Sequence, residues 1–313
     1  MTRVFALDVG GTFARLGVYE GLDQLWVEVH RTVDLRPLRD LVMDAIRDHD
    51  VEACGVAIAG PVDQGHARVT HGTWSASIAD IAVPAILLND LAAAAAAIPA
   101  LTSKDLVHLG GPAPDPKGVA CVLGLGTGIG EALLVHDQPV AGEGGHADFA
   151  PWDALSSAFL AWLHATKGTR IAIEDAIGGR AIADLLAFVA AREPLGAPVE
   201  RALHEHDPAV VLVEWADRDP GCAVARDLLL GALGAEAGNL ALRHLPRRGV
   251  YVVGGLARAL RAPLVASAPF DRGFSARGGM TDLVASIPRY LVTHPDPGLV
   301  GAAAAARKVL ATS

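Results

Sequence analysis

An amide and a carboxylate stand together at Asn89 and Asp90, where a short apolar run over 85–88 comes to an end. Residues 91–98 include six alanines and are stopped by Pro99, a composition that predicts a helix. Asp90 is therefore expected between the carboxyl end of a strand and the amino end of a helix, where α/β sheets bind ligands. A carboxylate there can take a proton from a substrate hydroxyl, although Asn and Asp are also ordinary helix N-caps.

A second polar group lies in the glycine-rich loop 141–149, where Glu143 and His146 are three residues apart. No second His or Cys stands at metal-ligand spacing, so the loop is expected to hydrogen-bond a polar ligand rather than zinc. The alternative is that both side chains are simply solvated, as polar loop residues usually are.

Residues 4–19 and 119–135 follow one plan, which is a strand-like run, a glycine-rich turn and a second strand-like run. Their tips can direct backbone N–H groups and the hydroxyls of Thr12 and Thr127 at a phosphate chain, or they can be ordinary hairpin turns. Neither turn is followed by the Lys of a P-loop, and neither opens a helix as a dinucleotide-binding loop does. The repetition favours a duplicated α/β domain with a cleft between the two copies.

Two further positions could contact a nucleotide. Asp8 stands at the mouth of the first hairpin and suits Mg²⁺ or its water shell; the alternative is an Asp that stabilises the turn. Gly254 and Gly255 follow an apolar run over 250–253 and precede an expected helix. A nucleotide approaching a helix start and a structural glycine turn both have this pattern.

The elements that position these residues follow from hydrophobic periodicity and end signals. We expect an amphipathic helix after Pro37, a strand over 51–59, and helices over 151–166, 181–192, 220–244 and 298–310. The stretch 110–118, rich in Gly and Pro, is the clearest linker-like segment, and a domain boundary is expected just before it, near residue 102.

Composition narrows the class of protein. The 313 residues are 51% hydrophobic and 19% charged, as in a globular protein, with a formal net charge of −9. No Lys/Arg-rich block offsets that charge, which argues against nucleic acid and anionic membranes as partners. We see no signal peptide or membrane span, and Cys54, Cys121 and Cys222 form no CxxC pair. Reduced thiols in a cytoplasmic protein are expected.

Taken in order, these motifs resemble those of the bacterial glucokinases, in the hexokinase and actin-like ATPase class, over nearly the whole chain. Residues 8–12 resemble the first phosphate motif of that family, 124–128 the second, and 254–255 the adenosine motif. The most specific likenesses are Leu-Asn-Asp at 88–90, Gly-Glu-Gly-Gly-His at 142–146, and the closing segment 294–301.

The resemblance implies two ribonuclease H-like (actin-like ATPase) α/β domains flanking a cleft, formed by 1–102 plus 298–313 and by 103–297. It implies an ATP-dependent glucokinase with Asp90 as the catalytic base toward the 6-hydroxyl of glucose. The sugar-binding residues that it implies are Asn89, Asp90, Glu143, His146 and Glu174. The nucleotide-binding residues that it implies are Asp8, Gly10, Gly11, Thr12, Gly126, Thr127, Gly128, Gly254 and Gly255, with Asp8 holding Mg²⁺ through water.

The chain departs from the family at two positions, since Phe13 and His71 stand where the family usually has Asn. It lacks the Cys-rich zinc motif of the related repressor and kinase family, so neither structural zinc nor a DNA-binding domain is expected. Related enzymes are commonly dimers, so a homodimer that binds glucose and ATP, without nucleic acid or membrane, is expected. The alternatives are a kinase for another hexose or amino sugar, and a non-catalytic sugar-sensing protein on the same fold.

Overall fold

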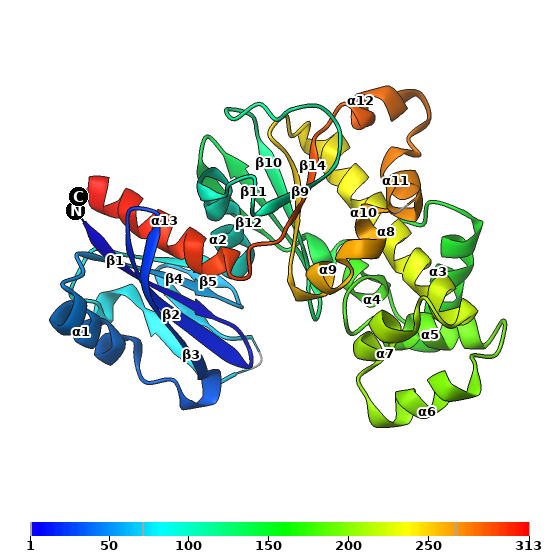
Figure 1. The fold of residues 1–313 in the computed structure, drawn as a ribbon, viewed down its shortest axis with the longest axis horizontal. Helices are drawn as coiled ribbons and strands as arrows, with labels where there is room; N and C mark the ends of the chain where they lie inside the picture. Colours follow the sequence, from blue (N-terminus) through cyan, green and yellow to red (C-terminus); the bar gives the residue numbers. More distant parts are fainter. Residues whose placement is uncertain (1, 71, 267, 313) are drawn as a thin grey trace. The chain divides into compact units, whose positions relative to one another are not determined.

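The protein forms two compact units, each built on a β-sheet with helices (Figure 1). A computed structural model describes residues 2–70, 72–266 and 268–312. Unit 1 comprises Met1–Asp105, Leu133–Ala141 and His294–Ser313, and unit 2 comprises Leu106–Ala132 and Gly142–Thr293. The predicted domain division, 1–102 plus 298–313 and 103–297, differs at both borders and in the segment 133–141, and it stays a prediction.

The sheet of unit 1 carries the first glycine-rich hairpin and ends at Asn89. Its strand order is β3-β2-β1-β4-β8, with β1, β2 and β3 antiparallel and β4 and β8 parallel to β1. The strands are β1 (Arg3–Val9), β2 (Phe13–Glu20), β3 (Asp23–Arg31), β4 (Ala53–Ile58) and β8 (Ala85–Asn89). The carboxyl ends of β1, β4 and β8 therefore meet at one edge, which is the ligand-binding edge of such sheets.

Helices cover the two faces of this sheet because its strands alternate their side chains between them. Phe5 and Leu7 pack with α1 (Leu38–His49), whereas Val4 and Ala6 pack with α13 (Pro297–Thr312). α2 (Asp90–Ala97) lies beside α13, and a Cβ on Gly301 would stand 1.7 Å from the carbonyl oxygen of Ala93. The predicted helices near Pro37, over 91–98 and over 298–310 are confirmed.

Short elements complete unit 1. A small antiparallel sheet is formed by β5 (Val62–Asp63), β6 (His66–Arg68) and β7 (Ser75–Ser77). Three 3₁₀ turns lie at Thr32–Asp34, Ile78–Asp80 and Ile98–Ala100, and the last contains the predicted stop residue Pro99.

The second sheet carries the second glycine-rich hairpin. Its strand order is β12-β11-β10-β13-β14-β9, with β10, β13 and β14 parallel and β9 antiparallel to β14. The strands are β9 (Leu106–Gly110), β10 (Ala120–Leu125), β11 (Ile129–Val135), β12 (Gln138–Gly142), β13 (Gly249–Val253) and β14 (Arg289–Val292). The segment 110–118, the Gly- and Pro-rich stretch expected just after the domain boundary, lies within unit 2 and continues from β9, which pairs with β14.

The helices of unit 2 include one long buried element, α8 (Pro220–His244), which matches the predicted range. It begins where Asp219 accepts a hydrogen bond from the backbone of Cys222 at 2.9 Å, with Pro220 in the first turn. The others are α3 (Ala154–Lys167), α4 (Ile173–Ala176), α5 (Ile182–Ala190), α6 (Ala197–Glu205), α7 (Pro208–Trp215), α9 (Gly255–Ala259), α10 (Arg261–Val265), α11 (Ala268–Ser275) and α12 (Thr281–Ala285). Two 3₁₀ turns lie at Gly144–His146 and Gly278–Met280.

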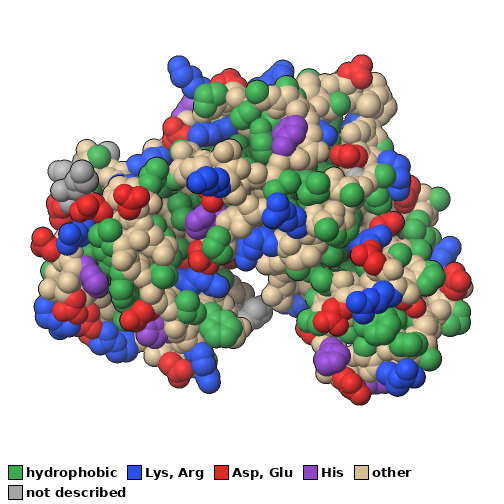
Figure 2. All heavy atoms as spheres, in the orientation of Figure 1, with side chains coloured by type: hydrophobic (Ala, Val, Ile, Leu, Met, Phe, Trp, Pro, Cys, Tyr) green, Lys and Arg blue, Asp and Glu red, His purple; other side chains and the backbone are tan. Residues whose placement is uncertain are grey.

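Acidic and basic side chains are interspersed over the face drawn in Figure 2, in keeping with a chain that has no basic block. Cys54, Cys121 and Cys222 are buried free thiols. In the part of the chain that the structure describes, no helix is both long and apolar enough to cross a membrane.

Candidate active site

Asn89 and Asp90 lie where β8 passes into α2, and their two side chains have different partners. The Asn89 Oδ1 atom accepts hydrogen bonds from the backbone N–H groups of Leu91 (3.0 Å) and Ala92 (3.4 Å). Its Nδ2 group donates to the carbonyl of Gly60 at 3.3 Å. Asn89 is therefore the N-cap, so the alternative in which Asp90 merely caps the helix is wrong. Asp90 is the first helical residue, half-buried, and its Oδ1 atom also accepts from the N–H of Leu91 at 2.9 Å.

Asp8 lies at the carboxyl end of β1 within a group of acidic side chains. Burial and the charges of Asp90 and Asp296 raise the pKa of Asp8 to about 7, while Arg15 acts in the opposite direction. The Nε atom of Arg15 is 2.6 Å from Oδ1 of Asp296, so its charge is shared. A Cβ on Gly298 would lie 2.6 Å from Oδ2 of Asp8, which places this carboxyl group against the first turn of α13. The electrostatic environment of Asp8 favours a cation.

The tip of the first hairpin holds its own backbone in place. The Gly10 N–H donates to the carbonyl of Phe13 at 3.0 Å, and the Thr32 N–H donates to the carbonyl of Thr12 at 2.9 Å. A Cβ on Gly11 would meet no atom within 4 Å, and Gly11, Thr12 and Phe13 are exposed. The tip therefore leaves room for a ligand beside Gly11.

The tip of the second hairpin is bound to the loop after α4. The Gly179 N–H donates to the carbonyl of Gly126 at 2.8 Å, and the Arg180 N–H donates to the carbonyl of Thr127 at 2.9 Å. Gly178 has a φ of +125°, and a Cβ there would lie 3.0 Å from the backbone of Gly128. These contacts fix a turn that would otherwise be flexible because of its glycines.

Three of the predicted sugar-binding residues lie together in unit 2. The Nδ1 atom of His146 is 3.3 Å from Oε1 of Glu174, and its Nε2 atom is 3.9 Å from Oε2 of Glu143. Glu174 belongs to the short helix α4, and Oε2 of Glu174 is 3.6 Å from the Cβ position of Gly128. The acids and the imidazole therefore lie next to the second glycine-rich turn, where they can bond hydroxyl groups.

Two buried glutamates beneath this loop were missed from the sequence. A Cβ on Gly144 would lie 1.8 Å from Oε2 of Glu131, so the carboxyl group of Glu131 directly supports the loop backbone. Glu131 hydrogen-bonds Glu236, which also contacts Asn239 at 2.9 Å and Arg243 at 3.0 Å. Nothing in the spacing of Glu131 and Glu236 marks them as partners, because α8 brings Glu236 from more than a hundred residues away.

Gly254 and Gly255 play different roles at the end of β13. Gly254 has a φ of +115°, and a Cβ there would lie 2.2 Å from the carbonyl oxygen of Leu125, so glycine is required for the turn. A Cβ on Gly255 would meet nothing within 4 Å, which leaves open space at the start of α9.

Two sequence-based expectations concern His71 and a metal ion. His71 lies outside the residues that the structure describes. Within the described residues, no group of three or more His, Cys, Asp or Glu side chains is arranged to hold a metal ion.

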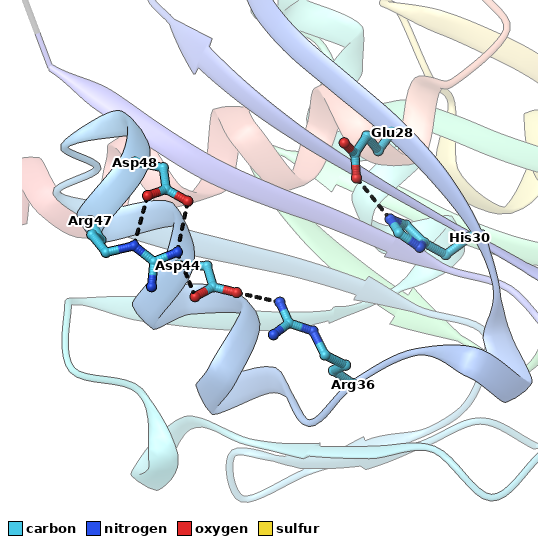
Figure 3. A network of polar contacts seen from close by, with 6 residues as sticks. All are labelled: Glu28, His30, Arg36, Asp44, Arg47 and Asp48. Atoms are coloured by element: carbon cyan, nitrogen blue, oxygen red, sulfur yellow. Dashed lines mark hydrogen bonds and ion pairs between the residues drawn. The ribbon is translucent and has the colours of Figure 1, made fainter.

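A polar pocket of about 240 Å³ lies away from all of these residues, between β3 and α1 in unit 1. Figure 3 shows the ion pairs at its rim, which join His30 to Glu28 and Arg36 to Asp44. None of the predicted site residues lines this pocket.

Comparison with known proteins identifies the class. A family model described as Glucokinase matches residues 5–309. A glucokinase from a Nostoc species is 31% identical, with 99% of this chain and 100% of that protein covered. The crystal structure of a glucokinase from an Antarctic psychrotroph has a TM-score of 0.85 at 25% identity, covering 98% of this chain and 99% of that one. A ROK family glucokinase from Streptomyces griseus, crystallised with glucose and AMPPNP, has a TM-score of 0.65 at 22% identity, covering 98% of this chain and 99% of that one.

The fold is therefore that of the sugar kinases of the actin-like ATPase class, as the sequence predicted. The chain belongs to the glucokinase family. The predicted family, fold class and kinase activity are confirmed, whereas the roles of individual residues stay predictions.

Proposed function

We propose that this protein transfers the γ-phosphate of ATP to the 6-hydroxyl of glucose, with Asp90 as the catalytic base. The observation that carries the proposal is the position of Asp90 in the first turn of α2, directly after a parallel strand and beside Asn89, which caps the helix. The glucokinase relatives and the glucose and AMPPNP named for the Streptomyces griseus structure support the substrates.

The proton of the 6-hydroxyl would pass to Asp90 as the hydroxyl oxygen attacks the γ-phosphorus. A new O6–P bond forms, the bond from the γ-phosphorus to the bridging oxygen breaks, and ADP leaves. The amino end of α2 stabilises an ionised Asp90, which a proton acceptor must be. Because the cap bonds of Asn89 fix its backbone, the neighbouring carboxylate is held in position.

The other sugar hydroxyls would be bound by Asn89 and by the cluster of Glu143, His146 and Glu174. Carboxylates accept hydrogen bonds, and an imidazole ring can donate or accept them. These side chains therefore suit sugar hydroxyls, which both donate and accept. Separations of 3.3 and 3.9 Å between the His146 ring and the two glutamates leave these three side chains within reach of one small ligand.

The phosphates would be bound by the two glycine-rich tips, Gly10, Gly11 and Thr12 on one and Gly126, Thr127 and Gly128 on the other. Gly254 and Gly255 would approach the adenosine. Phosphoryl transfer requires mainly the alignment of the reacting groups and the neutralisation of phosphate charge. Mg²⁺ supplies that neutralisation when bound. Asp8 would hold the ion through water.

The test is ATP-dependent phosphorylation of glucose, mannose, fructose and N-acetylglucosamine by wild type and Asp90→Asn. Rapid formation of glucose 6-phosphate by wild type, with a loss of orders of magnitude in Asp90→Asn and nearly unchanged glucose binding, supports the proposal. Preference for another sugar would indicate a different hexose or amino-sugar kinase. Glucose binding without any product would indicate the sugar-sensing alternative.

We also propose that the protein is a homodimer in the cytoplasm. β3 is an edge strand on which Leu25, Val27 and Val29 are exposed, with about half of each side chain in solvent. Antiparallel pairing of two copies of β3 about Val27 would set Leu25 opposite Val29 and Asp23 opposite Arg31. Apolar residues would then face apolar residues, and Asp23 would face the oppositely charged Arg31. The pairing would also cover the unpaired edge of β3 in both copies.

A further inference from the structure

We propose that Arg180 binds the phosphoryl group that is transferred, first on ATP and then on the sugar phosphate. Its backbone is fixed to the second glycine-rich tip, since the Arg180 N–H donates to Thr127 at 2.9 Å and the preceding Gly179 donates to Gly126 at 2.8 Å. A cation is thus attached to a turn proposed to hold phosphate. The inference rests on the proposed function and adds a residue to it.

The side chain of Arg180 points along that turn. Its Nη2 atom lies 3.6 Å from the Cβ position of Gly128, the same distance as Oε2 of Glu174. The residue is exposed, and within the described residues its guanidinium group makes no hydrogen bond or ion pair. An unpaired guanidinium presents a planar set of donors that matches the oxygens of a phosphate.

The two proposed phosphate loops carry no cation of their own. Neither tip contains a basic residue, and Arg15, which follows the first tip, is engaged with Asp296 at 2.6 Å. A nucleotide triphosphate carries several negative charges, which in this acidic chain need local compensation. Arg180 provides that compensation within unit 2.

The neighbours of Arg180 indicate which phosphate group its side chain binds. Arg180 and Glu174 both lie 3.6 Å from the Cβ position of Gly128, and Glu174 contacts His146 at 3.3 Å. The proposed phosphate and sugar sites of unit 2 adjoin at this point. A phosphoryl group there is the one that passes between the nucleotide and the sugar, so the 6-phosphate of the product would also contact Arg180.

The experiment measures binding rather than turnover alone. Calorimetric titrations with glucose, glucose 6-phosphate and ADP compare wild type, Arg180→Met, Arg180→Lys and Arg201→Met. Arg201, exposed on α6, is the matched control. We expect Arg180→Met to bind glucose 6-phosphate about tenfold more weakly, because a charged hydrogen bond is lost, with glucose affinity within about twofold. Arg180→Lys should recover part of the loss, and Arg201→Met should show none.

Equal affinity of Arg180→Met and wild type for glucose 6-phosphate would overturn the inference, as would an equal loss for glucose. Arg180→Gln provides a second neutral variant if thermal melts show that Arg180→Met is unfolded. The two proposals fail separately. If wild type phosphorylates glucose but the loss of Arg180 does not weaken the binding of glucose 6-phosphate, only the inference is contradicted. If Arg180 is needed to bind glucose 6-phosphate but wild type forms no product, only the proposed function is contradicted.

Discussion

The carboxyl group of Glu131 on β11 hydrogen-bonds that of Glu236 on α8, inside unit 2 and directly beneath Gly144. Burial and the charge of Glu236 raise the pKa of Glu131 to about 7, although Arg243 opposes the shift. Burial also raises the pKa of Glu236. At neutral pH the two carboxyl groups therefore retain at least part of a shared proton under the proposed sugar loop.

This pair predicts a pH-dependent stability. The pKa of Glu131 is near 4.5 in the unfolded chain and about 7 when folded, so the folded state binds more protons between these values. The free energy of unfolding should fall as pH rises from about 5 to 8. Thermal melts at both ends of this range should show a smaller fall for Glu131→Gln, whose amide no longer titrates. Glu200→Gln, exposed on α6, should match wild type.

Asp8→Asn should stabilise the ligand-free protein while it impairs catalysis. The substitution removes a carboxylate whose charge is disfavoured by burial and by repulsion from Asp90 and Asp296, so the melting temperature should rise at pH 8 by a few degrees. The gain should shrink toward pH 5, where Asp8 of the wild type is protonated. Differential scanning fluorimetry at the two pH values, together with the ATP-dependent assay, checks both parts. A lower melting temperature at pH 8 would contradict the electrostatic account.

Gly301→Ala should destabilise unit 1. The added methyl group would stand 1.7 Å from the carbonyl oxygen of Ala93, and neither backbone can yield without separating α2 from α13. The expected cost is about 3 kcal/mol, at the upper end for overpacking. Urea unfolding measures it. Gly279→Ala is the control, because a Cβ there meets nothing within 4 Å, and it should unfold as wild type does.

Val27→Lys should dissociate the proposed dimer. Two lysines would face each other at the centre of the paired β3 strands, and a charge in the middle of an edge strand opposes strand pairing. Light scattering during size-exclusion chromatography should report a dimer for wild type and a monomer for the variant. Lys308→Ala, on α13, should leave the mass unchanged. A wild-type monomer, or a dimeric Val27→Lys, would show that β3 does not form the interface.

Local patterns in the sequence predicted much of the fold. The two glycine-rich hairpins, the strand that ends at Asn89 and the helix over 220–244 are where the sequence predicted them. Each was marked by a local pattern in the sequence, namely a glycine-rich turn between strand-like runs, an apolar run that stops at Asn89, or a long stretch of helical residues. The start of α2 was displaced by one residue, from Leu91 to Asp90, because Asn89 is the N-cap and its amide oxygen accepts hydrogen bonds from the N–H groups of Leu91 and Ala92.

The unpredicted features depend on contacts between distant segments. Arg180 matters only because two backbone hydrogen bonds attach its loop to residues 126–127. Glu131 and Glu236 become partners only when α8 lies across the sheet strand that carries Glu131. The border of unit 2 lies at Leu106, where β9 begins, because β9 pairs with the distant strand β14. Composition and periodicity do not encode such long-range pairings.

The discontinuous make-up of unit 1 has a consequence for biosynthesis. Residues 1–105 supply the sheet that ends at Asn89, but one face of that sheet is covered by α13, through contacts such as Leu299 with Val4 and Ala6. On the ribosome, this apolar face stays open until α13 emerges, by which time nearly all of unit 2 has been made. The half of the protein that is synthesised first is therefore the half that finishes folding last, and nascent chains should depend on chaperones until α13 is in place.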